Sequence, residues 1–160
     1  MTKKIFKIVT IAYIITLGVV LGAGLYAGIV VAPTLFNSEL LLGSELLSNY
    51  QEGILMTQNF LKLAYMVNFM VFFVLVYEAI KWKSFESDKF TLIATFLVVA
   101  TGLLFTSYYV PDILKMQLAG EAMTQSEAFK NTHIGSEIDF KIFTFATLAL
   151  LILNIKKALR

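Results

Sequence analysis

The segment "IVTIAYIITLGVVLGAGLYAGIVVAPTLFNS" (residues 8–38) contains no charged residue. Secretory signals have a shorter apolar core of about 7–15 residues, and no small-residue cleavage site follows this one at a suitable distance, so we expect a membrane helix. The whole chain of 160 residues agrees, with 58% hydrophobic residues, 15% charged residues and a mean hydropathy of +0.78. Soluble domains average about 25% charged residues. The sequence therefore predicts an integral membrane protein.

Charged residues divide the rest of the chain into three further apolar segments. The sequence thus predicts an all-α fold, a polytopic bundle of four transmembrane helices in a single domain over residues 1–160. The expected spans are about 8–36, 56–80, 90–110 and 139–155. Pro33 and Pro111 lie at the ends of the first and third apolar runs, where a proline predicts a bend or a stop in the helix.

Two connections are rich in acids. Residues 38–50 repeat leucine near helical spacing after Ser38, which predicts a short amphipathic helix on the membrane surface, and residues 111–138 predict a similar segment. Eight of the eleven acidic residues lie in or beside these connections: Glu39, Glu45, Glu52, Asp112, Glu121, Glu127, Glu137 and Asp139.

The basic residues lie elsewhere. Nine of the thirteen Lys and Arg residues are in the two termini and the 81–89 connection, namely Lys3, Lys4, Lys7, Lys81, Lys83, Lys89, Lys156, Lys157 and Arg160. With four spans, these three regions share one side of the membrane. The positive-inside rule predicts that both termini are cytoplasmic and that the acidic connections face outward.

Several charged residues interrupt the apolar segments and leave uncharged lengths too short to cross a bilayer. His133, Glu137 and Lys141 share one helical face at i, i+4 spacing, and pairing would remove most of the cost of charges at this depth. The hypothesis is a substrate-binding polar cluster in the outer half of the bundle, made of Lys62, Asp112, His133, Glu137, Asp139 and Lys141, with Gln58 and Asn59. The alternative is that the long lysine side chains reach the head groups while their stems stay in lipid.

The residue inventory argues against several chemistries. The chain has no cysteine and one histidine, so thiolate metal sites and a bis-histidine haem are excluded, and no metal ligand or cofactor is assigned. No nucleophile elbow surrounds a serine, so no catalytic residue is assigned and an enzymatic activity is left open but not favoured. A net charge of +2 without a basic patch indicates no nucleic-acid partner.

The first apolar segment carries small residues at four-residue spacing, Gly18, Gly22, Gly24 and Gly28. Small residues let helix backbones approach in lipid, so this helix is expected to be a central packing element. It packs either against its own neighbours or against a partner, which would be a second copy or another membrane protein.

Three polar or aromatic residues of the second segment have simple interpretations. Asn68, in mid-span, predicts an interhelical hydrogen bond. Glu78 can pair with Lys81 or Lys83 at the membrane boundary, and Tyr77 is assigned to the boundary belt of aromatic residues.

The sequence around the two prolines is similar. "VAPTLF" (31–36) precedes a lysine 29 positions after Pro33, and "VPDIL" (110–114) precedes a lysine 30 positions after Pro111. Two hairpins of one design, arranged as a parallel repeat, would explain the likeness.

Four segments also carry a resemblance to a known family: "GLYAGIVVAPTLF" (24–36), "QEGILMTQNFLKLAY" (51–65), "YYVPDILKMQ" (108–117) and "SEAFKNTHIGSEIDFK" (126–141). They resemble the small bacterial membrane proteins classed as domain of unknown function 4149, a class that looks related to eukaryotic transmembrane protein 205. The resemblance implies a four-helix domain of the bacterial inner membrane and no mechanism.

Three functions follow as expectations. The first is a small transporter, channel-like or ligand-binding component of the membrane with a polar site in its outer half. The second is a structural subunit that packs against partner proteins through the glycine-rich helix. The third is a metal- or haem-handling oxidoreductase that uses His133 with Glu137. In all three the lipid bilayer is a partner.

Overall fold

The computed structural model of the protein describes residues 3–44, 46–84 and 88–159. Helices make up nearly all of this part of the chain: α1 (Lys3–Tyr26), the π-helical turn η1 (Ala27–Val31), α2 (Ala32–Phe36), α3 (Ser38–Leu42), α4 (Asn49–Lys83), α5 (Lys89–Leu104), the π-helical turn η2 (Phe105–Tyr109), α6 (Val110–Leu118), α7 (Glu121–Thr124) and α8 (Glu127–Ala158). The all-α prediction is confirmed.

Four uninterrupted helical runs dominate the described residues. They are Lys3–Phe36, Asn49–Lys83, Lys89–Leu118 and Glu127–Ala158, each long and apolar enough to cross a membrane. The chain is therefore a multi-pass membrane protein, and the predicted four-helix bundle is confirmed. The short helices α3 and α7 lie in the connections between these runs.

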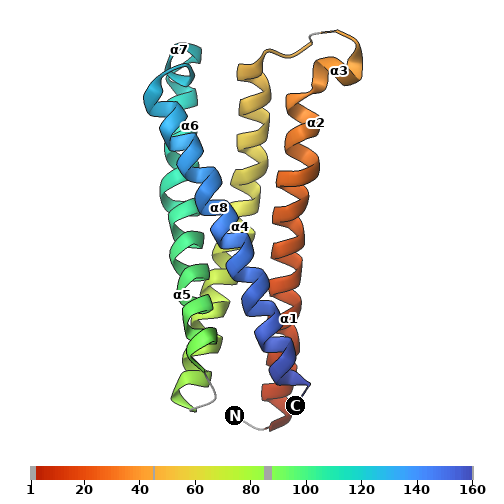
Figure 1. Ribbon diagram of the computed structural model, residues 1–160, viewed down its shortest axis with the longest axis vertical. Coiled ribbons are helices and arrows are strands. Elements are labelled where there is room, and N and C mark those ends of the chain that lie inside the picture. Colours follow the sequence, from red (N-terminus) through yellow and green to blue (C-terminus); the bar gives the residue numbers. More distant parts are fainter. Residues whose placement is uncertain (1–2, 45, 85–87, 160) are drawn as a thin grey trace.

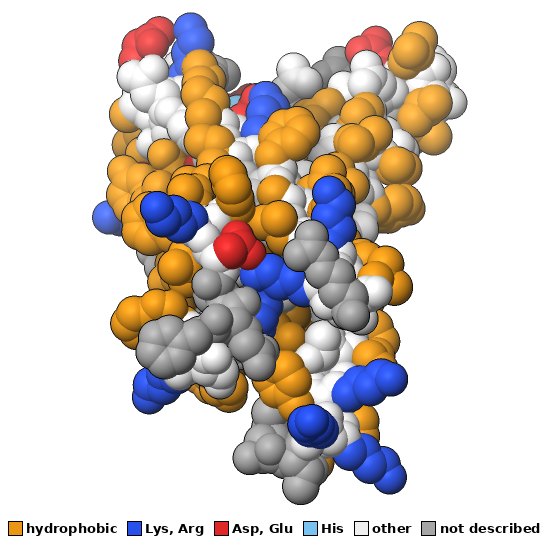
Figure 2. Space-filling model, turned by 60° about the horizontal axis from the view of Figure 1, so that its bottom comes forward, with side chains coloured by type: hydrophobic (Ala, Val, Ile, Leu, Met, Phe, Trp, Pro, Cys, Tyr) orange, Lys and Arg blue, Asp and Glu red, His pale blue; other side chains and the backbone are white. Residues whose placement is uncertain are grey.

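The bundle has two distinct ends (Figure 1). One end holds both termini together with Lys83, the last residue of α4, and Lys89, the first residue of α5; we call it the basic end. The other end carries α3 and α7, and we call it the capped end. Figure 2 brings the basic end forward and shows Lys side chains gathered there, with hydrophobic side chains covering the flanks of the bundle.

The four runs are longer than the hydrocarbon core of a bilayer. They contain 30–35 residues, which at about 1.5 Å per residue span roughly 45–52 Å, against about 30 Å for the core. Most of residues 111–138, which were expected to form the second outer connection, are helical and continue the long runs. α6 extends the third run, and α8 begins at Glu127.

Neither proline ends its helix. Pro33 and Pro111 each follow a π-helical turn by two residues, and in each turn a wider hydrogen bond forms: Ala32 N–H donates to Ala27 O, and Val110 N–H donates to Phe105 O. Proline has no N–H and clashes with the carbonyl four residues before it, and the wider turn accommodates that defect. The likeness of the two proline segments thus extends to the backbone.

The half of the bundle near the basic end is tightly packed. Its fully buried side chains come from all four runs, namely Tyr13, Leu17, Val67, Met70, Val74, Val98 and Leu150. Gly102 of α5 permits the closest approach, because a Cβ there would lie 2.7 Å from Val71 Cγ2 and 3.1 Å from the Phe143 ring. Asn68 accepts a 2.7 Å hydrogen bond from Thr106 of η2, which confirms the predicted interhelical bond.

The helices diverge towards the capped end. In Figure 1, α8 crosses α1 near the basic end and rises away from it towards α6 and α7. The run of α1, η1 and α2 stays on the other side, with α4 behind. This divergence leaves room for a cavity in the capped half.

Candidate functional site

A cavity of about 890 Å³ occupies the capped half of the bundle. Its walls are the run from Gly24 to Phe36, the first turns of α4, the segment from η2 to α7, and α8 from Phe129 to Phe145. All four long helices therefore contribute to the cavity.

Aromatic rings form the base of the cavity. Phe60 of α4, Phe105 of η2 and Phe140 of α8 line it, and their ring centroids lie 4.9–5.6 Å apart. Such edge-to-face and tilted pairs are favourable arrangements of aromatic rings. The base is thus an apolar surface assembled from three different helices.

The glycines of the first helix divide into two pairs. A Cβ at Gly24 would lie only 3.1 Å from the Phe140 ring, so this glycine makes room for the ring at the cavity wall. A Cβ at Gly28 would be in ordinary contact with the same ring, at 3.9 Å. At Gly18 and Gly22 a Cβ would meet no atom within 4 Å. Packing of the first helix against another protein stays a prediction.

A charged ladder follows the α8 wall. His133 Nε2 lies 3.3 Å from Glu137 Oε1, and Lys141 Nζ lies 3.4 Å from Glu137 Oε2. All three side chains line the cavity, with 46–67% of each exposed. Phe129 stacks on the His133 ring one turn earlier. The i, i+4 spacing read from the sequence thus gives the ladder directly.

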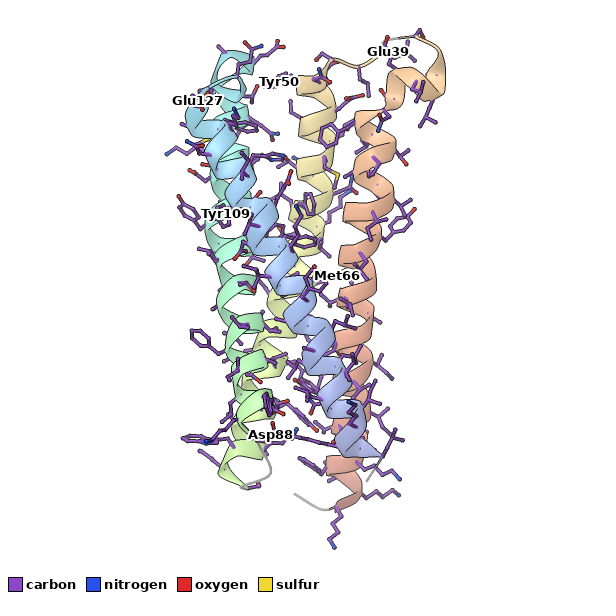
Figure 3. All side chains as sticks on the ribbon, in the orientation of Figure 1. Glu39, Tyr50, Met66, Asp88, Tyr109 and Glu127 are labelled. Carbon is purple, nitrogen blue, oxygen red and sulfur yellow. The ribbon has the colours of Figure 1, made fainter. Side chains whose placement is uncertain are left out.

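An uncharged polar group lines the cavity on the neighbouring helix α6. Gln117 of α6 lines the cavity and is only 4% exposed, and among the described residues its Oε1 has no hydrogen-bond partner. Its amide lies over Gly53, where a Cβ would be 3.5 Å from Nε2. The Tyr50 hydroxyl donates a 2.7 Å hydrogen bond to the main-chain carbonyl oxygen of Gln117 and so holds α4 to α6. Figure 3 shows Tyr50 at the capped end of the bundle.

The remaining residues of the predicted cluster do not line the cavity. Lys62, Gln58 and Asn59 are exposed on other faces of α4, and Asp112 is half-buried on α6. Asp139 is buried within α8, and its Oδ2 has no hydrogen-bond partner in the described part of the chain. The structure therefore brings together His133, Glu137 and Lys141 but not the whole set.

A second polar cluster lies in the basic half, outside the cavity. Glu78 Oε1 accepts hydrogen bonds from the Tyr13 hydroxyl and from Asn154 Nδ2, both at 3.0 Å. Lys81 Nζ donates to Asn154 Oδ1 at 2.7 Å and lies 3.6 Å from Glu78 Oε2. These four residues are at most 4% exposed. The cluster joins α1, α4 and α8, and we call it the inner network.

The inner network confirms one prediction and corrects another. Glu78 pairs with Lys81 as predicted, and both residues are buried in the protein. Tyr77 is also buried: it stacks on Tyr13 with centroids 4.0 Å apart, and its hydroxyl lies 2.9 Å from Thr10 Oγ1. It belongs to the interior and not to the aromatic belt, because the helix turns this face towards α1.

A more exposed ion pair fastens the basic end. Lys157 of α8 lies 2.5 Å from Asp88 and donates a 2.8 Å hydrogen bond to Thr91 Oγ1. Asp88 caps α5 by accepting from the Thr91 N–H. The hydrogen bond from Lys157, together with that cap, holds the pKa of Asp88 well below its usual range. Figure 3 shows Asp88 at this end of the bundle.

Comparison with known proteins gives the family of the chain. The family model for the domain of unknown function DUF4149 matches residues 15–122. The chain belongs to this family. No curated protein and no solved structure matches the chain.

The residues matched by the family model include some of the structural features of this DUF4149 protein and exclude others. Residues 15–122 include both π-helical turns, Gln117 and the Glu78–Lys81 pair. The charged ladder and Asn154 belong to α8 and lie outside the matched residues. Within the described chain no three His, Asp or Glu side chains are placed to hold a metal ion.

Three residues of these sites were not predicted from the sequence: Gln117, and Tyr13 and Asn154 of the inner network. Gln117 lies in a polar segment where nothing in the local pattern marks it as buried. Tyr13 and Asn154 contact Glu78 across 65 and 76 positions of sequence. The available signal was their polarity within apolar segments, since polar groups in lipid need partners.

Proposed function

We propose that this DUF4149 protein is a lipid-binding component of the bacterial inner membrane, which takes one amphipathic molecule from the outer leaflet into its cavity. The orientation follows from the positive-inside rule, which directs the basic end to the cytoplasm and the cavity to the outer half of the membrane.

The depth of the ladder supports this placement. With Lys156 of α8 at the inner boundary, Lys141 lies about 22 Å up the helix and His133 about 34 Å, against a core of about 30 Å. The ladder then crosses the outer boundary of the hydrocarbon, where lipid head groups meet their acyl chains. A charged side chain at that depth is costly unless it is paired or hydrated, and the cavity gives Lys141 both Glu137 and an open space.

The side of the cavity supports entry from lipid. Leu25 and Ile29 on the first run and Phe145 on α8 line the cavity and are also 40–71% exposed on the surface of a membrane helix. Acyl chains surround such side chains in a bilayer. The space between these two walls is therefore continuous with the acyl region.

The single observation that carries the proposal is the polarity gradient of the cavity. Its base is made of Phe60, Phe105 and Phe140, with Lys141 at the same level of α8, and most of its other polar groups line it towards the capped end. A volume of about 890 Å³ falls in the range of small-molecule sites, roughly 300–1,000 Å³. An amphipathic molecule with its head group towards the capped end matches both regions.

Binding is favoured over a continuous channel. The basic half is filled by the apolar core and by the inner network, so the cavity does not continue to the basic end through the described residues. A transporter of the bound lipid would have to separate these contacts.

The test uses two glycines of one helix. Leucine at Gly28 projects into the cavity, whereas leucine at Gly22, which is exposed and away from the cavity lining, does not. We expect Gly28→Leu to lose most of the crosslinking to a phospholipid with a photoreactive acyl chain, and Gly22→Leu to keep it. Equal crosslinking in both variants and the wild type would refute the proposal. Absence of lipid crosslinking in a protein that purifies with a stoichiometric protein partner would also refute it.

A further inference from the structure

The polar lining of the cavity restricts the head group of its ligand. Among the described residues, the charged members of the lining are Glu121, Glu137 and Lys141, with His133 as the titratable neighbour. Two carboxylates against one ammonium leave a net charge of −1 when His133 is neutral and zero when it is protonated. A lining of this charge offers no attraction to a net anionic head group.

The ladder itself is already balanced. Glu137 uses one carboxylate oxygen towards His133 and the other towards Lys141. Lys141 is therefore already paired with a carboxylate and is not an isolated cation that would favour a phosphate group. A head group that carries both charges, or neither, can approach this wall without leaving one of these side chains uncompensated.

Gln117 adds a requirement of a different kind. Gln117 is only 4% exposed. Its side-chain oxygen Oε1 is a buried acceptor, and no described group donates a hydrogen bond to it. A buried polar atom without a partner is costly, and a ligand that donates a hydrogen bond there removes the cost. Gly53 of α4 packs against this amide, since a Cβ there would lie 3.5 Å from Gln117 Nε2, and Gln117 itself lines the cavity.

We infer that the ligand is a lipid without net charge whose head group donates a hydrogen bond to the side chain of Gln117. The ammonium of phosphatidylethanolamine and the hydroxyl of diacylglycerol both meet this description. Phosphatidylcholine has the same charge as phosphatidylethanolamine but no N–H, and phosphatidylglycerol has hydroxyl donors but a net negative charge. This inference rests on the proposed lipid site and names its ligand class.

The experiment is a competition between four head groups on one acyl chain. The full-length protein is purified in detergent, mixed with equal amounts of dioleoyl phosphatidylethanolamine, phosphatidylcholine, phosphatidylglycerol and dioleoylglycerol, and the retained lipids are counted by native mass spectrometry. We expect phosphatidylethanolamine, dioleoylglycerol or both, the two lipids with a donor and no net charge, to be retained about tenfold over phosphatidylcholine and phosphatidylglycerol, as a buried hydrogen bond provides.

Variants connect the preference to Gln117. Gln117→Leu should bring the preference for phosphatidylethanolamine over phosphatidylcholine close to one, and Gln58→Leu, the same change on an exposed face of α4, should keep it. Equal retention of phosphatidylethanolamine and phosphatidylcholine by the wild type would overturn the inference, and so would a preference for phosphatidylglycerol; neither result depends on the folding of a variant. Lipid retention that is lost in Gly28→Leu but indifferent to head group would sink this inference and leave the proposed function standing. Retention that no cavity variant changes would sink both.

Discussion

Replacing Lys81 with methionine would remove the only cation of the inner network while keeping most of its apolar stem. The lysine donates to Asn154 at 2.7 Å, lies 3.6 Å from Glu78 Oε2, and sits 5.3 Å from the centre of the Tyr77 ring. Without it, Glu78 would keep its bonds from Tyr13 and Asn154 but would be a buried carboxylate with no ion pair to another described residue.

The expected cost follows from the burial of the pair. Both side chains are at most 5% exposed, and breaking a buried ion pair by removing one partner costs about 3–5 kcal/mol. At roughly 1.4 kcal/mol for each factor of ten, Lys81→Met should weaken the folding equilibrium by at least a hundredfold. The double variant Glu78→Gln with Lys81→Met should recover part of the loss, since glutamine can still accept from Tyr13 and Asn154.

Reversible unfolding in mixed micelles, measured for the wild type, both single variants and the double variant, gives the coupling energy of the pair. Lys83→Met is the matched control, because Lys83 is an exposed lysine in the same last turn of α4 and should change stability little. Losses that simply add in the double variant, or a Lys81→Met effect as small as that of Lys83→Met, would refute the account of the inner network.

Three further predictions concern packing, pH and topology. Gly102→Ala should destabilise the bundle by about 1–3 kcal/mol, because its Cβ would lie 2.7 Å from Val71 Cγ2, and thermal unfolding against Gly22→Ala, where nothing lies within 4 Å, measures the difference; equal melting temperatures would contradict the packing. Asp88→Asn should lower the melting temperature slightly at pH 7, where the depressed pKa of Asp88 lets its ion pair with Lys157 stabilise the fold. The gap to the wild type should close as the pH falls below about 4, whereas a gap that widens there would reverse the sign. In this cysteine-free chain, Gln125→Cys should react with an impermeant thiol reagent on intact spheroplasts and Ser84→Cys only after permeabilisation, and the opposite pattern would invert the proposed orientation.

The four-helix architecture could be predicted from the sequence because it depends on the lengths of uncharged segments, and the thickness of the bilayer sets those lengths directly. The helix ends lie outside the bilayer core, so its thickness does not set their positions. Asn49 and Glu127 start their helices well outside the apolar segments, each after a serine that caps the first turn, and this extension has no hydropathy signal. A proline in an apolar run predicts a bend or a stop, and the π-helical turns show how the helices continue past Pro33 and Pro111.

Only the part of the candidate site that lies along a single helix could be predicted from the sequence. The i, i+4 spacing of the ladder fixes mutual contacts within α8 whichever way the helix faces. For Lys62 and Asp112 the question was which face points inward, and a helix that is apolar all round in lipid gives no such signal. Contacts such as Tyr13 with Glu78, which are 65 positions apart, depend on how separate helices pack.

A structure determined in lipid nanodiscs, with density resolved in the capped half, tests the central claim most directly. The account predicts one elongated lipid density between the Gly24–Gly28 wall and α8, with its chain over Phe140 and its head group beside Gln117. A cavity closed by contact between the first run and α8, or one filled by a helix of another protein, would contradict it.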